Sequence, residues 1–327
     1  MKQNIAVIGC GYWGKNLVRN FSEISALAAV CDPDTNVGYE MSLKYGVPCL
    51  SYEDILASEH IEGVVLAVPA PMHCEMALKA LEANKHVFVE KPLAMNVREA
   101  LKMIERAELQ GRELMVGHLL QYHPAFLKLS QLVFDGYLGE VTYIYSNRLS
   151  FGKIRDKEDV IWSFAPHDIS MILKLANSQP VEVKAFSSSN LRPDIADNAT
   201  ISMRFENGLR AHAFVSWLHP YKEQKLVVIG NKAMAVFDDT KDWGEKLLVY
   251  EHGVLVSGAQ VDLKKAEGQF VEVDQAEPLK NECLHFCDVV SGNVKAKTDG
   301  EEGRMVLEVL SAATRSIRNA ASSEATY

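Results

Sequence analysis

The sequence has no apolar run of the roughly 18 residues that a membrane-spanning helix needs, and no signal-peptide core follows its first residues. Its six cysteines form no Cys-x-x-Cys pair, so a zinc or dithiol site is not indicated and reduced thiols are expected. Basic residues are in deficit, with 34 Lys and Arg against 43 Asp and Glu, which argues against a nucleic-acid-binding surface. We therefore expect a cytoplasmic protein with no membrane, nucleic-acid or metal partner.

The 327 residues are 48% hydrophobic, and this length favours two domains of roughly 150 residues each. Strand-like and helix-like segments alternate in the first third, where 63–69 is a continuous apolar run. The pattern changes after Gly117, where a helix is expected over residues 124–135 and strand-like segments dominate beyond it. We therefore predict an α/β chain, with a doubly wound parallel sheet in residues 1–121 and an α+β domain with a large, mostly antiparallel sheet in residues 122–327. One face of that second sheet must be covered by helices or by another subunit.

The most informative motif is a glycine-rich turn near the start of the chain. The β-branched run 4–8 leads into Gly-x-Gly-x-x-Gly, and a segment with helical apolar spacing follows. In such a turn the glycines allow a sharp bend and close approach of a pyrophosphate to the N–H groups at the helix start. The sequence therefore predicts a dinucleotide site, and the residues expected to contact the dinucleotide are Gly9, Gly11, Tyr12, Trp13 and Gly14.

An acidic residue follows at the expected distance. Asp32 ends a second strand-like segment, 18 residues after Gly14, where a carboxylate can accept hydrogen bonds from the adenosine ribose. Pro33-Asp34 supplies no basic residue for a 2′-phosphate. We therefore expect the cofactor to be NAD rather than NADP.

Two further segments follow predicted parallel strands and should lie at the same edge of the sheet. Val68, Pro69 and His73 follow one strand, and we expect them at the cofactor crevice. Two roles fit His73, contact with cofactor or sugar and a hydrogen bond at the start of a helix. Glu90 and Lys91 end the next strand, and we expect them beside the cofactor as well. A partly desolvated lysine there can hold or donate a proton, and Glu90 can orient it.

A third candidate segment lies in the second domain, at residues 162–170. Pro166 indicates the start of a helix, which would place His167 in the first turn and bias its imidazole toward the neutral form. A neutral imidazole suits a general base. Asp168 could polarise the site or cap the helix.

These motifs occur in the order and spacing of the Gfo/Idh/MocA oxidoreductases, which the whole chain resembles. The resemblance implies oxidation or reduction of one hydroxyl of a sugar, cyclitol or nucleotide sugar with NAD or NADP. It implies that Lys91 and His167 form an acid/base pair, with Glu90 holding Lys91, and that Tyr122 contacts substrate. The chain departs from the family at Ser163, where many members have Asp, and at Gln121, where many have Arg.

Within the family, residues 117–124, 146–155 and 162–168 together look like the UDP-N-acetylglucosamine 3-dehydrogenases, whose 3-keto product goes to a partner aminotransferase of 3-amino sugar and lipid A biosynthesis. We predict that a basic cluster of Arg148, Lys153 and Arg155 meets the UDP pyrophosphate, unless it is a solvated loop. The resemblance also implies a homodimer or homotetramer. The alternatives are a relative acting on an inositol, a free sugar or a UDP-sugar uronate, and a catalytically silent NAD-binding regulator.

Overall fold

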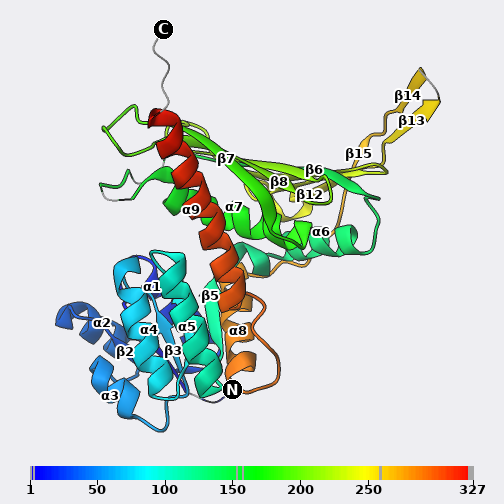
Figure 1. Cartoon of the computed structure of the whole chain (residues 1–327). Helices are drawn as coiled ribbons and strands as arrows, with labels where there is room; N and C mark the ends of the chain where they lie inside the picture. The colour runs from blue at the N-terminus through cyan, green and yellow to red at the C-terminus, as the bar shows by residue number, and fades with distance from the viewer. Residues whose placement is uncertain (1, 3, 152–153, 157, 258–259, 323–327) are drawn as a thin grey trace. The chain divides into compact units, whose positions relative to one another are not determined.

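The computed structural model describes residues 2, 4–151, 154–156, 158–257 and 260–322. The chain forms two compact units, shown in Figure 1. Unit 1 comprises Met1–Tyr122 and Ala276–Leu307, and unit 2 comprises His123–Gln275 and Glu308–Tyr327. The predicted boundary at residue 121 lies next to the observed one. The predicted extent of the second domain, 122–327, differs from the structure because 276–307 returns to unit 1.

Unit 1 contains a five-stranded, wholly parallel sheet with the order β2-β1-β3-β4-β5. Its strands are β1 (Ile5–Ile8), β2 (Leu27–Cys31), β3 (Gly63–Leu66), β4 (His86–Glu90) and β5 (Leu114–Gly117). Its helical elements are α1 (Gly14–Glu23), α2 (Thr35–Tyr45), α3 (Tyr52–Ala57), η1 (Ala70–Met72), α4 (His73–Glu82), α5 (Val97–Gln110), η2 (Leu119–Tyr122) and α8 (Pro278–Val290). The predicted doubly wound parallel sheet is confirmed. Because the strand order changes direction at β1, a ligand crevice is expected at the carboxyl ends of β1 and β3.

Local sequence signals set the bounds of several helices in this unit. The Asn96 side chain accepts a hydrogen bond of 3.0 Å from the Glu99 N–H at the start of α5, and Gly111 ends the helix in the left-handed conformation. Asn at an N-cap and Gly at a left-handed C-cap are the residue types that these positions favour. Among the described residues, no helix is both long and apolar enough to cross a membrane.

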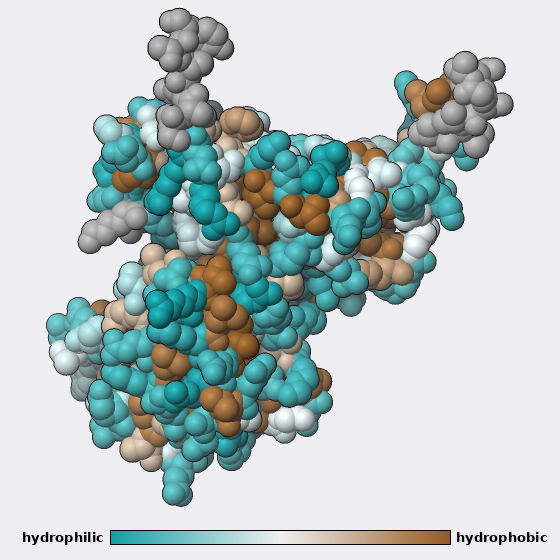
Figure 2. All heavy atoms as spheres, in the orientation of Figure 1, coloured by the Kyte–Doolittle hydropathy of each residue, from teal (hydrophilic) through white to brown (hydrophobic). Residues whose placement is uncertain are grey.

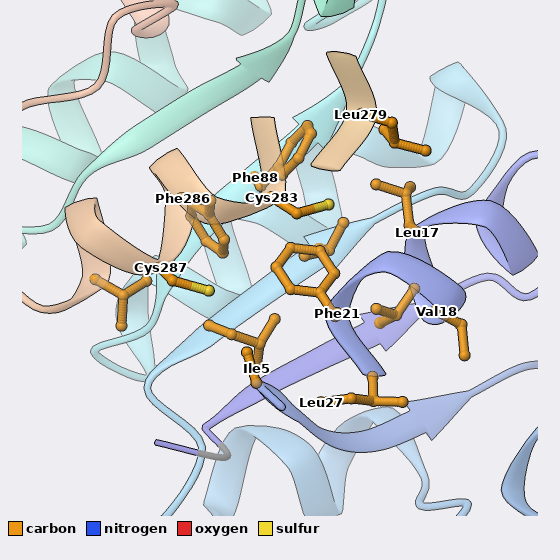
Figure 3. Close-up of a cluster of buried hydrophobic side chains, with 14 of the residues drawn as sticks. Ile5, Leu17, Val18, Phe21, Leu27, Phe88, Leu279, Cys283, Phe286 and Cys287 are labelled. Carbon is orange, nitrogen blue, oxygen red and sulfur yellow. The ribbon is translucent and has the colours of Figure 1, made fainter. Parts of the chain in front are cut away.

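The core of unit 1 includes side chains from α8, a helix distant in sequence from the sheet that it covers. Phe286 packs edge-on against Phe88 of β4, with ring centroids 5.6 Å apart, and against Phe21 of α1 at 6.3 Å. Figure 3 shows these rings with Cys283 and Cys287 of the same helix. Burial of this apolar stripe is the physical reason why residues 276–307 belong to unit 1.

Unit 2 is built on an eight-stranded sheet with the order β15-β12-β11-β10-β6-β9-β8-β7. Its strands are β6 (Val141–Leu149), β7 (Pro180–Ser188), β8 (Asn198–Phe205), β9 (Arg210–Ser216), β10 (Glu223–Gly230), β11 (Met234–Asp238), β12 (Leu247–Tyr250) and β15 (Gly268–Phe270). All neighbours are antiparallel except β6 and β9. A separate hairpin pairs β13 (Gly253–Ser257) with β14 (Gln260–Lys264). The predicted mostly antiparallel sheet is confirmed.

Helices cover one face of this sheet. Figure 1 shows α6 (Pro124–Phe134) and α7 (Val160–Ala176) on the same side of it. The short η3 (Trp243–Glu245) precedes β12, and α9 (Gly300–Ser322) contributes its residues from Glu308 onward to this unit. Each unit presents a mainly hydrophilic surface with smaller hydrophobic patches in the view of Figure 2.

Candidate active site

The glycine-rich turn of unit 1 is closely packed against the end of β3. Gly9 has φ +91°, and a Cβ there would lie 2.5 Å from the Ala67 carbonyl oxygen. A Cβ on Gly14 would overlap the carbonyl oxygen of Gly9, whereas a Cβ on Gly11 would meet no atom within 4 Å. Gly9 and Gly14 are therefore required for packing of the turn, while Gly11 leaves space beside the start of α1.

This difference predicts opposite effects of two alanine substitutions. Gly14→Ala should lower the free energy of unfolding by about 1–3 kcal/mol because its methyl group meets backbone that cannot move aside. Gly11→Ala should leave stability within about 0.5 kcal/mol of wild type and weaken NAD binding, since its methyl group occupies free space beside the turn. Thermal unfolding without cofactor and NADH fluorescence titration measure the two effects. Equal effects of both variants on stability would contradict this assignment.

The start of α1 has the features of a phosphate site. Among the residues that the structure describes, no side chain caps this helix, and its first turn contains no acidic residue. Asp32 lies beside the turn, where its carboxylate accepts from the Cys10 N–H at 2.6 Å and from the Asp34 N–H at 2.9 Å. An uncapped helix N-terminus next to a carboxylate fits the pyrophosphate and ribose of a dinucleotide.

The segment after β3 forms the next part of this edge. Val68 is half-buried, Pro69 is exposed, and His73 is the first residue of α4. The His73 ring lies between two carbonyl oxygens, with Nδ1 2.8 Å from that of Pro92 and Nε2 2.9 Å from that of Val68. Burial lowers the pKa of this imidazole. Its geometry matches the helix-start hydrogen bond considered above, and contact with cofactor or sugar stays a prediction.

The end of β4 holds the candidate acid/base lysine. Glu90 is buried, and its Oε1 accepts a hydrogen bond of 2.5 Å from the indole Nε1 of Trp13. Its Oε2 accepts from the Lys91 N–H at 3.3 Å, and burial raises the pKa of Glu90. Gly117 lies opposite Glu90 in β5, and a Cβ there would be 2.9 Å from Glu90 Oε2. The Trp13–Glu90 bond, which links the glycine-rich turn to the lysine, was not anticipated from the sequence.

A second group of polar side chains follows β5. His118 Nδ1 pairs with Glu302, and Gln121 Nε2 donates to Glu302 Oε1 at 2.9 Å. The Tyr122 side chain is 2% exposed, and its hydroxyl lies 3.0 Å from Thr298 Oγ1. This placement favours a packing role for Tyr122 over the predicted substrate contact.

His167 of unit 2 occupies a different part of its helix from the one predicted. Asp159 is the N-cap of α7 and accepts from the Trp162 N–H at 3.0 Å, so the helix begins at Val160 and Pro166 lies inside it. His167 is therefore the eighth residue of α7. The expected first-turn position was wrong, and the expected dipole effect on the imidazole no longer applies because that effect is confined to the first turn. His167 is half-buried.

Asp168 is neither a helix cap nor solvent-exposed. Its Oδ2 accepts from Arg148 Nε at 2.6 Å, its Oδ1 accepts from Arg148 Nη2 at 3.3 Å, and Ser146 donates a further hydrogen bond. Ser146 and Arg148 alternate with Asn147 along β6, which turns them toward the face that α7 covers. Of the two roles considered for Asp168, the helix cap is corrected to a buried ion pair that joins α7 to the sheet, and polarisation of the site stays a prediction.

The three predicted basic residues therefore have different surroundings. The Arg148 side chain is buried against Asp168, which favours a structural role over the predicted pyrophosphate contact. Arg155 is exposed and pairs with Glu158, and Lys153 lies outside the described residues. A pyrophosphate contact from Arg155 or Lys153 stays a prediction. Among the described residues, no group of three or more His, Cys, Asp or Glu is placed to hold a metal ion.

Comparison with protein families gives a match to both parts of the chain. Residues 3–118 match the family model of the oxidoreductase family with the NAD-binding Rossmann fold. Residues 126–236 match that of the GFO/IDH/MocA C-terminal domain.

Curated relatives cover most of the chain at low identity. The UDP-N-acetylglucosamine 3-dehydrogenase of Acidithiobacillus ferrooxidans is 27% identical over 302 residues, which is 92% of this chain and 93% of that protein. The inositol 2-dehydrogenase of Salmonella typhimurium is 23% identical over 248 residues, or 72% of this chain and 74% of that protein.

Solved structures share the fold along the whole chain. A structure of the Acidithiobacillus ferrooxidans UDP-N-acetylglucosamine 3-dehydrogenase superposes with a TM-score of 0.85 at 25% identity, covering 97% of this chain and 98% of that one. A protein of gentamicin A biosynthesis, solved in complex with NAD, superposes with a TM-score of 0.82 at 20% identity, covering 98% and 95%. The second likeness concerns the fold alone.

Proposed function

The chain belongs to the Gfo/Idh/MocA family of NAD-binding oxidoreductases, and from this membership we propose that it oxidises the C3 hydroxyl of UDP-N-acetylglucosamine to the 3-keto sugar. The observation that supports this substrate most is the likeness, in sequence and fold, to the Acidithiobacillus ferrooxidans enzyme along more than nine-tenths of both chains. The cofactor is NAD, which fits the uncapped start of α1 and the position of Asp32.

The proposed reaction divides the work between cofactor and protein. Bound NAD supplies the acceptor for the hydride that leaves C3 of the sugar. His167 accepts the proton of the C3 hydroxyl as general base, and the Lys91 ammonium stabilises the negative charge that develops on that oxygen. Lys91 belongs to unit 1 and His167 to unit 2, so their convergence on one carbinol is part of the proposal.

Glu90 acts in this proposal as a positioning residue. Its carboxylate accepts from the Lys91 N–H and from the Trp13 indole, and it is held in the small space above Gly117. An anion at this place favours the ammonium form of the neighbouring lysine. The 3-keto product is an electrophilic ketone, and we propose that an aminotransferase of 3-amino sugar and lipid A biosynthesis consumes it.

A substrate screen tests the proposal. The purified protein with NAD should form NADH, followed by its absorbance, with UDP-N-acetylglucosamine as substrate. Little or none should form with myo-inositol, free N-acetylglucosamine or a UDP-sugar uronate. Preference for inositol would support the relationship to the inositol 2-dehydrogenases instead. NAD binding without turnover of any substrate would support the silent regulator.

We also propose that a second copy of the chain covers the face of the unit 2 sheet opposite α7. Paired residues share a face, and the row through Tyr145 is rich in aromatic and aliphatic side chains. It continues through His212, Val227, Val236, Leu248 and Phe270. Phe186, on the same face two strands beyond β9, is 69% exposed. Phe270, at the other end of the row, is 56% exposed, whereas Val227 in the middle of the row is buried. Exposed aromatic side chains on a sheet face are typical of an interface.

Light scattering tests this association. Wild-type protein should have a mass that is a multiple of 36.4 kDa, and Phe186→Asp should shift it toward the protomer. Leu101→Asp is the matched control, since Leu101 is 50% exposed on α5 of unit 1 and should leave the mass unchanged. A monomeric wild-type protein would contradict the proposed interface.

A further inference from the structure

The side chain of Glu282 on α8 is completely buried and unsatisfied. It is 0% exposed, and neither carboxyl oxygen has a hydrogen-bond partner in the part of the chain that the structure describes. A buried carboxylate without a donor is very costly, whereas a neutral carboxylic acid costs much less. Burial accordingly raises the pKa of Glu282 well above its ordinary value.

The packing of α8 places Glu282 near the carboxyl end of β4. Val290 and Phe286 lie against Gly63, which is paired with His86 at the start of β4. The Phe286 ring packs on Phe88 in the middle of that strand, as Figure 3 shows. The helix therefore runs antiparallel to β4. Glu282 precedes Phe286 by four residues, or about 6 Å along the helix axis, which is close to the length of two residues in a strand. Glu282 therefore lies near Glu90, which follows Phe88 by two residues.

Glu90 and Glu282 thus form a pair of buried carboxyl groups behind Lys91. The negative charge of Glu90 contributes to the raised pKa of Glu282. Two neighbouring carboxyl groups in a low-dielectric interior cannot both ionise at low cost, so such a pair keeps one proton.

The surroundings decide which member keeps it. Glu90 accepts hydrogen bonds from the Trp13 indole and the Lys91 N–H, and these bonds and the charge of Lys91 oppose the rise in the pKa of Glu90 that burial causes. The titratable groups facing Glu282 are Glu90, Tyr122 and Cys283. Burial raises the pKa of both the Tyr122 hydroxyl and the Cys283 thiol, so both groups stay neutral and neither places a charge next to Glu282. Anion-stabilising groups therefore gather at Glu90.

We propose that Glu282 is a positioning residue that stays protonated behind Glu90, and thereby keeps the single negative charge of the pair on Glu90, facing Trp13 and Lys91. This inference rests on the proposed role of Lys91 in the oxidation. If Glu282 ionised, a second buried anion would compete for the proton of Glu90 and for the charge of Lys91. Loss of the Glu282 proton at alkaline pH should therefore disturb the site.

Infrared difference spectroscopy on the full-length protein without substrate tests the protonation state directly. Wild type at neutral pH should show the carbonyl band of a buried protonated carboxylic acid, and Glu282→Gln should lack it. Glu277→Gln is the matched control, because Glu277 precedes the same helix but is partly exposed and paired with Arg19. Absence of the band in wild type, or its persistence in Glu282→Gln, would overturn the proposal.

The pH dependence of kcat/KM for UDP-N-acetylglucosamine then tests the positioning role. Glu282→Gln should keep the acid limb and the turnover near neutral pH, and should lose the alkaline limb caused by ionisation of Glu282. Glu277→Gln should keep both limbs. Glu282→Leu is also neutral and should give the same pH profile. It therefore serves as a second variant if Glu282→Gln folds poorly. A profile of Glu282→Gln that superimposes on wild type would contradict the role. Lack of wild-type turnover would instead refute the proposed substrate, and the infrared result would still decide the state of Glu282.

Discussion

Lys91→Ala should lose roughly 100-fold to 10,000-fold in kcat while its affinity for NAD stays within a few-fold of wild type. The substitution removes an ammonium proposed to stabilise the developing alkoxide, and it leaves the glycine-rich turn and Asp32 in place. His167→Ala should lose a similar factor because it removes the proposed general base. Initial rates of NADH formation and NADH fluorescence titration measure the two quantities.

The control for this experiment is Lys102→Ala, which removes an exposed lysine from α5 of the same unit. It should retain wild-type kcat and NAD affinity. If Lys91→Ala and His167→Ala both retained turnover, the assignment of the acid/base pair would be wrong. Loss of NAD affinity in Lys91→Ala would instead make the lysine a cofactor-binding residue rather than an acid/base group.

Asp168→Ala should lower the stability of unit 2 by about 3–5 kcal/mol, because it leaves the buried Arg148 guanidinium without its partner. The double variant Arg148→Met/Asp168→Leu should be much closer to wild type, since a buried ion pair replaced by apolar side chains is often neutral in stability. Urea unfolding followed by circular dichroism measures both. Equal destabilisation of the single and double variants would show that the cost comes from lost packing rather than an unpaired charge.

The sequence was sufficient where a signal is local. The strand, glycine-rich turn and helix at residues 4–21 lie as predicted. Asn96 and Gly111, which bound α5, are also residue types that favour the start and the end of a helix. The turn at residues 206–208 joins the antiparallel strands β8 and β9, and it contains the Asn-Gly pair that is typical of hairpin turns. These features depend on backbone chemistry within a few residues, so no tertiary information is needed to find them.

Features that depend on distant packing were not predicted. Pro166 was interpreted as the start of a helix. The Asp159 cap lies seven residues earlier, and the proline lies inside α7. Arg148 was interpreted as a ligand contact. It faces α7 instead, because the register of the whole sheet decides which face of β6 meets that helix. The packing of α8 in unit 1 depends on the contact between Phe286 and Phe88. An amphipathic sequence pattern predicts a helix with one apolar face, but it does not specify which element that face packs against.

The candidate site shows the same division. The positions of Asp32, Glu90 and Lys91 at the carboxyl ends of parallel strands follow from the predicted alternation of strand and helix. The hydrogen bond from Trp13 to Glu90 joins residues far apart in the sequence. It could be foreseen only from the pairing of Glu90 with Gly117, which leaves room for the carboxylate.

Transfer of the hydride from C3 of the sugar is the central claim, and isotopic labelling tests it most directly. The protein with NAD and UDP-N-acetylglucosamine carrying deuterium at C3 should form reduced cofactor that contains the deuterium, as measured by mass spectrometry. Substrate labelled at C4 should give unlabelled NADH. Transfer of deuterium from C4, or formation of no reduced cofactor from either substrate, would contradict the proposed reaction.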